Sequence, residues 1–337
     1  MLEVPLLLVC IVVVALIFDY TNGAHDTGNV IATVVSTNAL SPLAAVMMAA
    51  TFNFAGAMVG DQVAQTIGKG IVNPEMIAGC RTLVLAALLG AISWNVITWI
   101  FGLPSSSSHA LIGGLIGAAI AYRGWDCIEY DNVVLKVLLP IVLSPLAGFV
   151  IGYLGMVGLS WLSVNARPGR ANRTYRRLQL VSSSLMAFSH GMNDAQKTMG
   201  IIALALFLFG QIPSVMVPLW VKLACASAIA LGTATGGWQI IKTMGSKFFK
   251  IEPIHGFAVQ SSSAVVIELA TAAGAPISTT HVISSSLLGA GASKRPSAVR
   301  WGIAGHMVVA WVLTLPAAAV VSAACLWFLR MAFPDWA

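Results

Sequence analysis

Two aspartates stand inside apolar stretches of a chain that carries few charges. Asp26 lies in the segment 22–29, which reads NGAHDTGN, and Asp194 lies in the segment 190–197, which reads HGMNDAQK. A carboxylate in the hydrocarbon layer of a membrane costs at least ~2.5 kcal/mol unless it has a partner or faces water. Neither segment contains an arginine. The expected partner is therefore a cation, a proton or, for Asp194, the lysine one helical turn further on.

The residues around the aspartates suit the coordination of a small cation. Asn29 and Asn193 add amide oxygens, and the neighbouring glycines would let a helix unwind and free its carbonyls. We therefore predict a coupling-ion site at Asp26, Asn29, Asn193 and Asp194, in which the two aspartates are metal ligands if the ion is sodium. A simpler alternative is that each aspartate is the N-cap of a half-helix.

Four histidines lie close to these polar segments, and we expect them to handle protons. His25 and His190 belong to the aspartate segments, whereas His109 and His281 each follow a run of hydroxyl residues. An unperturbed imidazole changes its charge near pH 6.5, which suits proton transfer. Packing of a neutral ring is the simpler reading for His109 and His281.

Two proline-led runs of hydroxyl residues form the second kind of site. Residues 104–109 read PSSSSH and residues 276–281 read PISTTH. Each run precedes a stretch of small residues typical of a helix. Hydroxyls and free backbone N–H groups at a helix start attract an anion, although ordinary capping explains many such starts. Phosphate suits this arrangement better than sulfate, since HPO₄²⁻ carries a proton that a carboxylate can accept.

The composition predicts that these residues are held by helices in a bilayer. Of the 337 residues, 58% are hydrophobic and 9% are charged, against roughly 25% charged in soluble domains. This excludes a soluble enzyme, and apolar runs of this length exclude an outer-membrane barrel. The apolar segments lie at 4–18 and on to about 37, 43–66, 82–103, 133–164, 178–209, 213–240, 255–275 and 300–330.

The aspartate segment and the hydroxyl run both occur twice, in the same order, about half a chain apart. An odd number of predicted crossings separates the copies, so the second would enter the membrane inverted. We expect an all-α polytopic protein with inverted-topology repeats, broken helices, two re-entrant hairpins and about 10–12 membrane segments. The repeats would be 1–164 and 178–337, joined by an Arg-rich cytoplasmic loop at 165–177.

The basic residues predict the orientation. Most of the 18 Lys and Arg residues fall in the segments 165–177, 242–250 and 294–300. Short cytoplasmic loops carry such an excess, so both termini are expected outside. The positive net charge then reflects topology, and we expect no nucleic-acid partner.

These motifs together resemble the inorganic phosphate transporter (PiT) family over essentially the whole chain, and most of all its bacterial low-affinity permeases. The resemblance implies a homodimeric symporter with a central phosphate between two hairpins. The phosphate ligands that it implies are Ser106, Ser107, Ser108, Ser278, Thr279 and Thr280. Where many sodium-coupled eukaryotic members have glutamates this chain has Asn53 and Gln260, and it has His25 in place of asparagine. Those departures resemble permeases that are driven by protons and accept metal–phosphate complexes.

We therefore expect a symporter of the cytoplasmic (inner) membrane, rather than an enzyme, with no cofactor. It would import inorganic phosphate, free or as a metal complex, with co-transported H⁺ or Na⁺ by alternating access. One alternative, a divalent metal cation transporter that uses the same aspartates, leaves the hydroxyl runs unexplained. The other, an intramembrane hydrolase using Ser107 or Ser108, lacks the usual triad geometry because its histidine is adjacent in the chain.

Overall fold

A computed structural model describes residues 5–246 and 249–334, and this part of the chain is nearly all helical. Its α-helices are α1 (Leu6–Ser36), α2 (Pro42–Ala57), α3 (Gln62–Lys69), α4 (Pro74–Ile77), α5 (Leu83–Ile100), α6 (Ser107–Arg123), α7 (Tyr130–Asn132), α8 (Leu139–Leu162), α9 (Pro168–Leu208), α10 (Leu219–Thr235), α11 (Trp238–Ser246), α12 (Pro253–Ala272), α13 (Thr279–Lys294) and α14 (Trp301–Ala332). Short 3₁₀ turns (Trp125–Cys127 and Pro296–Ala298) and a π-helical stretch (Val133–Leu138) complete the list.

Several of these helices are long and apolar enough to cross a bilayer. In the described residues, α1, α5, α14 and the continuous stretch Tyr130–Leu162 each qualify by length and composition. Two further spans result if the bent pairs α2–α3 and α10–α11 are each counted as one. The predicted all-helical membrane class is confirmed, while the count of about 10–12 segments stays a prediction.

The helices that carry the two aspartates are unbroken, so the expected unwinding at their glycines is wrong for this structure. Asp26 lies in the interior of α1, and Asp194 lies in the interior of α9. The glycines serve close packing instead: a Cβ on Gly23 would lie 2.3 Å from the Ile229 carbonyl oxygen of α10. Small residues at such crossings let helix backbones approach closely, and an unbroken helix satisfies its own backbone groups in lipid.

The helix breaks in this structure lie instead within the segments 43–66 and 213–240, which the sequence predicts as single spans. The axis bends by 70° between α2 and α3 and by 68° between α10 and α11. Gly60 and Gly236 adopt positive φ angles of 76° and 70° at these points, which other residues rarely do. Gly237 also needs to lack a side chain, because a Cβ there would lie 2.3 Å from the Ala24 carbonyl oxygen of α1.

The two hydroxyl runs lie at the turns of helix pairs. Helices α5 and α6 pack against each other around residues 101–106, and α12 and α13 do so around residues 273–278. Gly102 and Gly274 have positive φ in these turns. The runs therefore stand at the tips of two helical hairpins, although whether these hairpins are re-entrant in the membrane stays a prediction.

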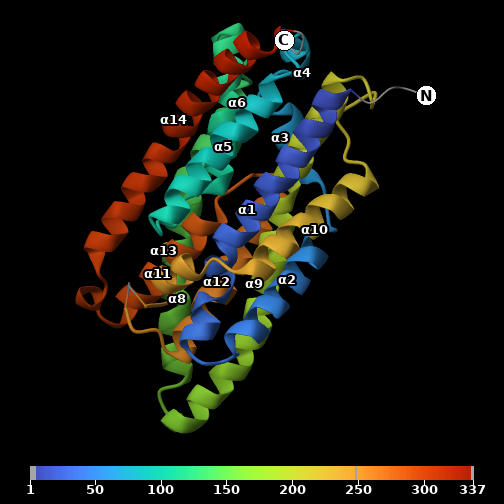
Figure 1. The fold of residues 1–337 in the computed structure, drawn as a ribbon. Helices are drawn as coiled ribbons and strands as arrows, with labels where there is room; N and C mark the ends of the chain where they lie inside the picture. Colours follow the sequence, from blue (N-terminus) through green and yellow to red (C-terminus); the bar gives the residue numbers. More distant parts are fainter. Residues whose placement is uncertain (1–4, 247–248, 335–337) are drawn as a thin grey trace.

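The segment predicted as an Arg-rich loop is helical from residue 168 on. It forms the first turns of α9, and the start of α9 is tied to the end of α8 by a 2.5 Å hydrogen bond between Tyr175 and Ser163. This end of the molecule lies opposite the start of α1 and the end of α14, which lie together (Figure 1). The start of α1 and the end of α14 therefore lie on one side of the molecule, as the predicted topology requires. Which side is cytoplasmic stays a prediction.

Two clusters of buried apolar side chains flank a polar layer. Helix α1 contributes Leu8 and Phe18 to the first cluster and Val30 to the second, while its segment 19–29 between them is rich in polar residues. Helix α9 passes through the clusters in the reverse order, so α1 and α9 are antiparallel (Figure 1). That direction is the one an inverted repeat requires, and the repeat itself stays a prediction.

We expect Gly191→Ala to destabilise the fold, because the added Cβ would lie 2.1 Å from the backbone oxygen of Asn53 in α2. Overpacking of this kind costs about 1–3 kcal/mol. The measurement is the thermal unfolding midpoint of the purified protein in detergent. Gly158→Ala in α8 is the matched control, since no atom lies within 4 Å of its added Cβ. Equal midpoints for the two variants would contradict the packing role.

Candidate functional site

The two aspartates meet a histidine in the polar layer between the apolar clusters. Asp26 of α1 and Asp194 of α9 are 2% and 0% exposed. His190 Nε2 lies 2.9 Å from Asp194 Oδ2 and 3.8 Å from Asp26 Oδ2. One ligand atom from each of the three lies within 4.8 Å of the others. These residues could therefore hold a metal ion, and their helix-interior positions exclude the N-cap alternative for both aspartates.

The tip of the second hairpin binds both carboxylates. Thr279 donates a hydrogen bond of 2.9 Å to Asp194 Oδ2, and Thr280 donates one of 3.2 Å to Asp26 Oδ1. Asn29 donates to the Thr280 hydroxyl at 2.8 Å. The hydroxyl run and the aspartates, which the sequence treats as two kinds of site, thus form one network.

Lys197 joins this network to the first hairpin. Lys197 is 1% exposed, and its ammonium group donates to Asp194 Oδ1, to the Ser108 hydroxyl and, at 2.7 Å, to the Ile277 carbonyl oxygen. Ser108 belongs to the first hairpin tip and Ile277 to the second. A single side chain of α9 therefore links Asp194 to both tips.

The histidines predicted to handle protons all lie in or beside the network. His25 Nδ1 lies 2.8 Å from Asp26 Oδ1. His109 and His281 face each other from the two hairpins, with ring centroids 4.5 Å apart at an angle of 81°. His281 also stacks on Trp311 of α14 at 4.0 Å. These contacts give the second pair a packing role in this structure, and proton handling by any of the four stays a prediction.

Besides Ser108, Thr279 and Thr280, which belong to the network, the hydroxyl runs contain two helix caps and one hydroxyl without a partner. Ser106 and Ser278 accept hydrogen bonds from the backbone N–H groups of His109 and His281, so both are N-caps of α6 and α13. The Ser107 hydroxyl is buried and has no hydrogen-bond partner among the described residues. A buried hydroxyl left without a partner is unfavourable, and its position at the N-terminus of α6 suits a bound anion.

Not every predicted coupling residue contacts the carboxylates. The Asn193 amide donates instead to Thr271 at 2.7 Å and to the Ala275 carbonyl oxygen at 3.3 Å. Its Oδ1 atom, like that of Asn29, is buried without a hydrogen-bond partner in the described part of the chain. Two amide oxygens are therefore available to a cation, which keeps both residues as candidates.

Two groups of residues at this site are not among the predicted site residues, although the sequence singles out Asn53 as a departure from the sodium-coupled relatives. Asn53 of α2 lies 3.1 Å from His190 Nδ1 and donates to Thr233 of α10 at 2.8 Å, which fixes the histidine ring. Asp19 is a third buried carboxylate, 0% exposed, that accepts from Thr198 at 3.0 Å. Asp19 stands seven residues before Asp26, a spacing that places both on one helix face, and this spacing was the available signal.

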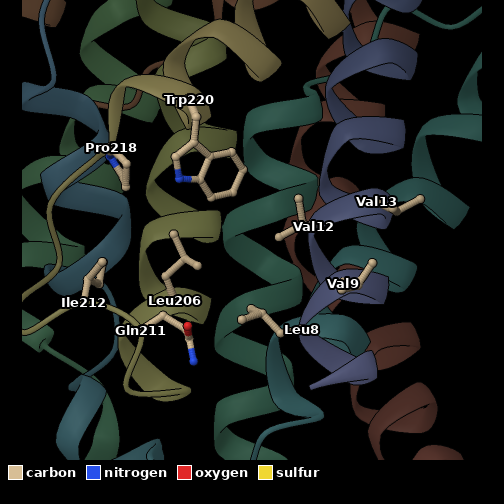
Figure 2. Close-up of a pocket in the computed structure, with 9 residues that line it drawn as sticks. All are labelled: Leu8, Val9, Val12, Val13, Leu206, Gln211, Ile212, Pro218 and Trp220. Carbon is tan, nitrogen blue, oxygen red and sulfur yellow. The ribbon is translucent and has the colours of Figure 1, made fainter. Parts of the chain in front are cut away.

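The surface pocket drawn in Figure 2 is a different feature. It is lined by nine residues of α1, α9, α10 and the connection between α9 and α10, with Trp220 above Leu206. Almost all of these side chains are apolar, and none belongs to the network around the aspartates. A lining of this kind suits contact with lipid rather than binding of an ion.

Comparison with known proteins identifies relatives along almost the whole chain. Residues 22–322 match the model of the phosphate transporter family. A probable low-affinity inorganic phosphate transporter of Rhizobium meliloti is 51% identical over 95% of both chains, and a protein of the same description from Bacillus subtilis is 46% identical over 97% of this chain and 98% of its own. A solved structure, described as the sodium-dependent phosphate transporter, superposes with a TM-score of 0.82 at 26% identity, covering 96% of this chain and 99% of the other.

We expect Thr280→Val to weaken the contact between α1 and the second hairpin, because the variant keeps the shape of the side chain and loses the hydroxyl bonded to Asp26 and Asn29. A hydrogen bond to a charged group contributes about 1.5–3 kcal/mol. Thermal unfolding in detergent measures the loss. The control is Thr51→Val in α2, whose exposed hydroxyl bonds only to its own helix at the Met47 carbonyl. A midpoint no lower than that of the control would contradict the link.

Proposed function

The chain belongs to the phosphate transporter family, and from that premise we propose that it is a secondary active symporter that imports inorganic phosphate together with H⁺ or Na⁺ by alternating access. The relatives are named as transporters, which bears out the expectation that this chain is not an enzyme. Phosphate transport is thus the shared property of the family, and the coupling, the ligands and the motion are the proposal.

One observation supports coupling between cation binding and phosphate binding: the hydroxyls of Thr279 and Thr280 donate hydrogen bonds to the carboxylates of Asp194 and Asp26. An anion that takes hydrogen bonds from these hydroxyls competes with Asp194 and Asp26 for the same donors. A cation bound at the carboxylates neutralises them and frees the hydroxyls, since attraction between charges is strong in a dry site. Binding of the cation and of phosphate would therefore favour each other, as symport requires.

We propose that phosphate lies between the two hairpin tips. Its ligands would be the hydroxyls and backbone N–H groups of Ser106, Ser107, Ser108, Ser278, Thr279 and Thr280. Ser106 and Ser278 already cap their helices, so they would contribute mainly through the helix starts that they order. Ser107 is the side chain whose hydroxyl is free to bind the anion.

The coupling-ion residues in this proposal are Asp26, Asn29, Asn193 and Asp194. The buried Oδ1 atoms of the two asparagines have no partner in the described residues and would complete the oxygen ligands of a sodium ion. If the coupling ion is a proton, His25 and His190 are the groups in contact with the carboxylates. We further propose a homodimer in the cytoplasmic membrane, with the termini outside and the two halves 1–164 and 178–337 related as inverted repeats.

Uptake of radiolabelled phosphate into proteoliposomes tests the function. We expect wild-type uptake when a pH gradient or a sodium gradient is imposed alone, and the effective gradient identifies the coupling ion. Asp26→Asn should abolish this gradient-driven uptake, because the amide carries no charge for the cation to neutralise. Asp126→Asn, which makes the same chemical change at an exposed aspartate outside the site, is the control. Wild-type uptake by Asp26→Asn would contradict the assignment, and no uptake by the wild-type protein under either gradient would contradict symport.

The cluster of Asp26, His190 and Asp194 also favours one other cargo, a divalent metal ion. The ammonium group of Lys197 on Asp194 opposes it, because a fixed positive charge repels a divalent cation. The same proteoliposomes distinguish the two cases. Phosphate uptake that persists in the presence of a chelator favours free phosphate as the cargo, and metal uptake without phosphate would favour the metal carrier.

We expect Ser107→Ala to weaken apparent phosphate affinity, because a free hydroxyl is lost from the anion site. One hydrogen bond to a charged group corresponds to about 1.5–3 kcal/mol, a rise of roughly tenfold or more in the Michaelis constant. Ser144→Ala is the matched control, since the Ser144 hydroxyl in α8 is also buried without a partner but lies outside the hairpin tips. Equal Michaelis constants for the two variants would argue against the phosphate site.

A further inference from the structure

The surroundings of the Lys197 ammonium group are those of a small bound cation. Its three contacts are a carboxylate oxygen of Asp194, the hydroxyl of Ser108 and the backbone carbonyl of Ile277. Carboxylate, hydroxyl and carbonyl oxygens are the ligands that hard cations take in proteins. Two of the three contacts are to groups that can only accept a hydrogen bond, and the third is a hydroxyl that can accept one, so the nitrogen can use all three protons of the charged form.

The two aspartate segments differ at the position of this lysine. Asn29 follows Asp26 by three residues, and Lys197 follows Asp194 by three residues. The neutral Asn29 amide bonds to Thr280, so Asp26 has no lysine on its own helix turn, where its neighbour is the His25 ring with Nδ1 2.8 Å from Asp26 Oδ1. Both oxygens of Asp194 are engaged, by Lys197 on one side and by His190 and Thr279 on the other. In contrast, Asp26 Oδ2 lies 3.8 Å from His190, beyond hydrogen-bond distance.

We propose that the Lys197 ammonium group is a tethered cation that permanently fills the coupling-ion position beside Asp194, so that transported cations bind only on the Asp26 side. This inference rests on the proposed symport. Because the tether is covalent, its charge stays with α9 through the transport cycle and is not carried across the membrane with phosphate. A transporter in which both aspartates bound a mobile cation would carry one cation at each of them. With the Asp194 position filled by Lys197, each phosphate is accompanied by one cation fewer.

The test is Lys197→Asn, which gives the second segment the residue that the first has at the same position. Removal of the ammonium group opens the Asp194 position to a mobile cation. The logarithm of phosphate accumulation is measured against the logarithm of the imposed Na⁺ gradient and, separately, of the H⁺ gradient. We expect the sum of the two slopes to rise by one relative to the wild-type protein. Sodium chloride, compared with choline chloride, should raise the unfolding midpoint of the variant by several degrees more than that of the wild-type protein.

Three further variants isolate the cause. Lys197→Arg keeps the charge, so both slopes should equal the wild-type values even if its rate of uptake is lower. Lys222→Asn makes the same chemical change at a lysine that bonds to the Gly60 carbonyl outside the site, and it should show neither effect. The double variant Asp194→Asn with Lys197→Asn removes both charges, so sodium should raise its midpoint no more than that of the wild-type protein.

Unchanged slopes in Lys197→Asn would overturn the tethered cation. So would a loss of phosphate affinity that no monovalent cation restores, which would make Lys197 a phosphate ligand. If the single variant cannot be purified in either salt while the double variant folds, sodium does not replace the ammonium group and the inference fails. Absence of phosphate uptake by the wild-type protein would instead refute the proposed function, so the two failures are distinguishable.

Discussion

The arrangement of this protein depends on the cost of keeping two carboxylates away from water. Asp26 and Asp194 lie in unbroken helices between two apolar clusters, where an isolated negative charge is strongly unfavourable. Their partners come from separate parts of the chain: the second hairpin gives Thr279 and Thr280, and α9 gives His190 and Lys197. The need to satisfy the carboxylates thus brings the hairpin tips to the centre of the molecule.

Close helix packing is the second condition, because these short hydrogen bonds require helices whose backbones nearly touch. Gly23 of α1 meets the Ile229 carbonyl of α10, and Gly232 of α10 meets the Tyr20 carbonyl of α1. Gly191 of α9 and Gly56 of α2 make the same reciprocal contact through Asn53 and Phe188. In lipid there is little hydrophobic force between helices, so van der Waals contact at small residues does much to hold them together. The glycines near the aspartates therefore position the site rather than flex it.

The sequence predicts the membership of the site better than its geometry. Both aspartates and the hydroxyl runs stand out because polar groups are costly in an apolar chain, and the structure brings them together. The continuity of α1 and α9 is not predictable from glycine content, since the same residue permits both unwinding and close packing. Asn53 and Thr233 lack a local pattern of their own, and their roles depend on contacts between distant helices. Asp19 offers only its spacing from Asp26, and its contact with Thr198 again joins two helices.

The hairpin tips are bound more weakly to α1 than to α9, so separating them from the two helices would cost different free energies. On the Asp26 side, α1 is bonded to the second hairpin through the neutral donors Asn29 and Thr280, which a cation and water can replace. On the Asp194 side, Lys197 and Asp194 belong to the same helix and stay paired, but separation of α9 from the tips would leave the buried ammonium group without its acceptors on Ser108 and Ile277. The weaker bonds are the ones expected to exchange during a transport cycle. The hairpin tips should therefore stay with α9 while α1 moves relative to them.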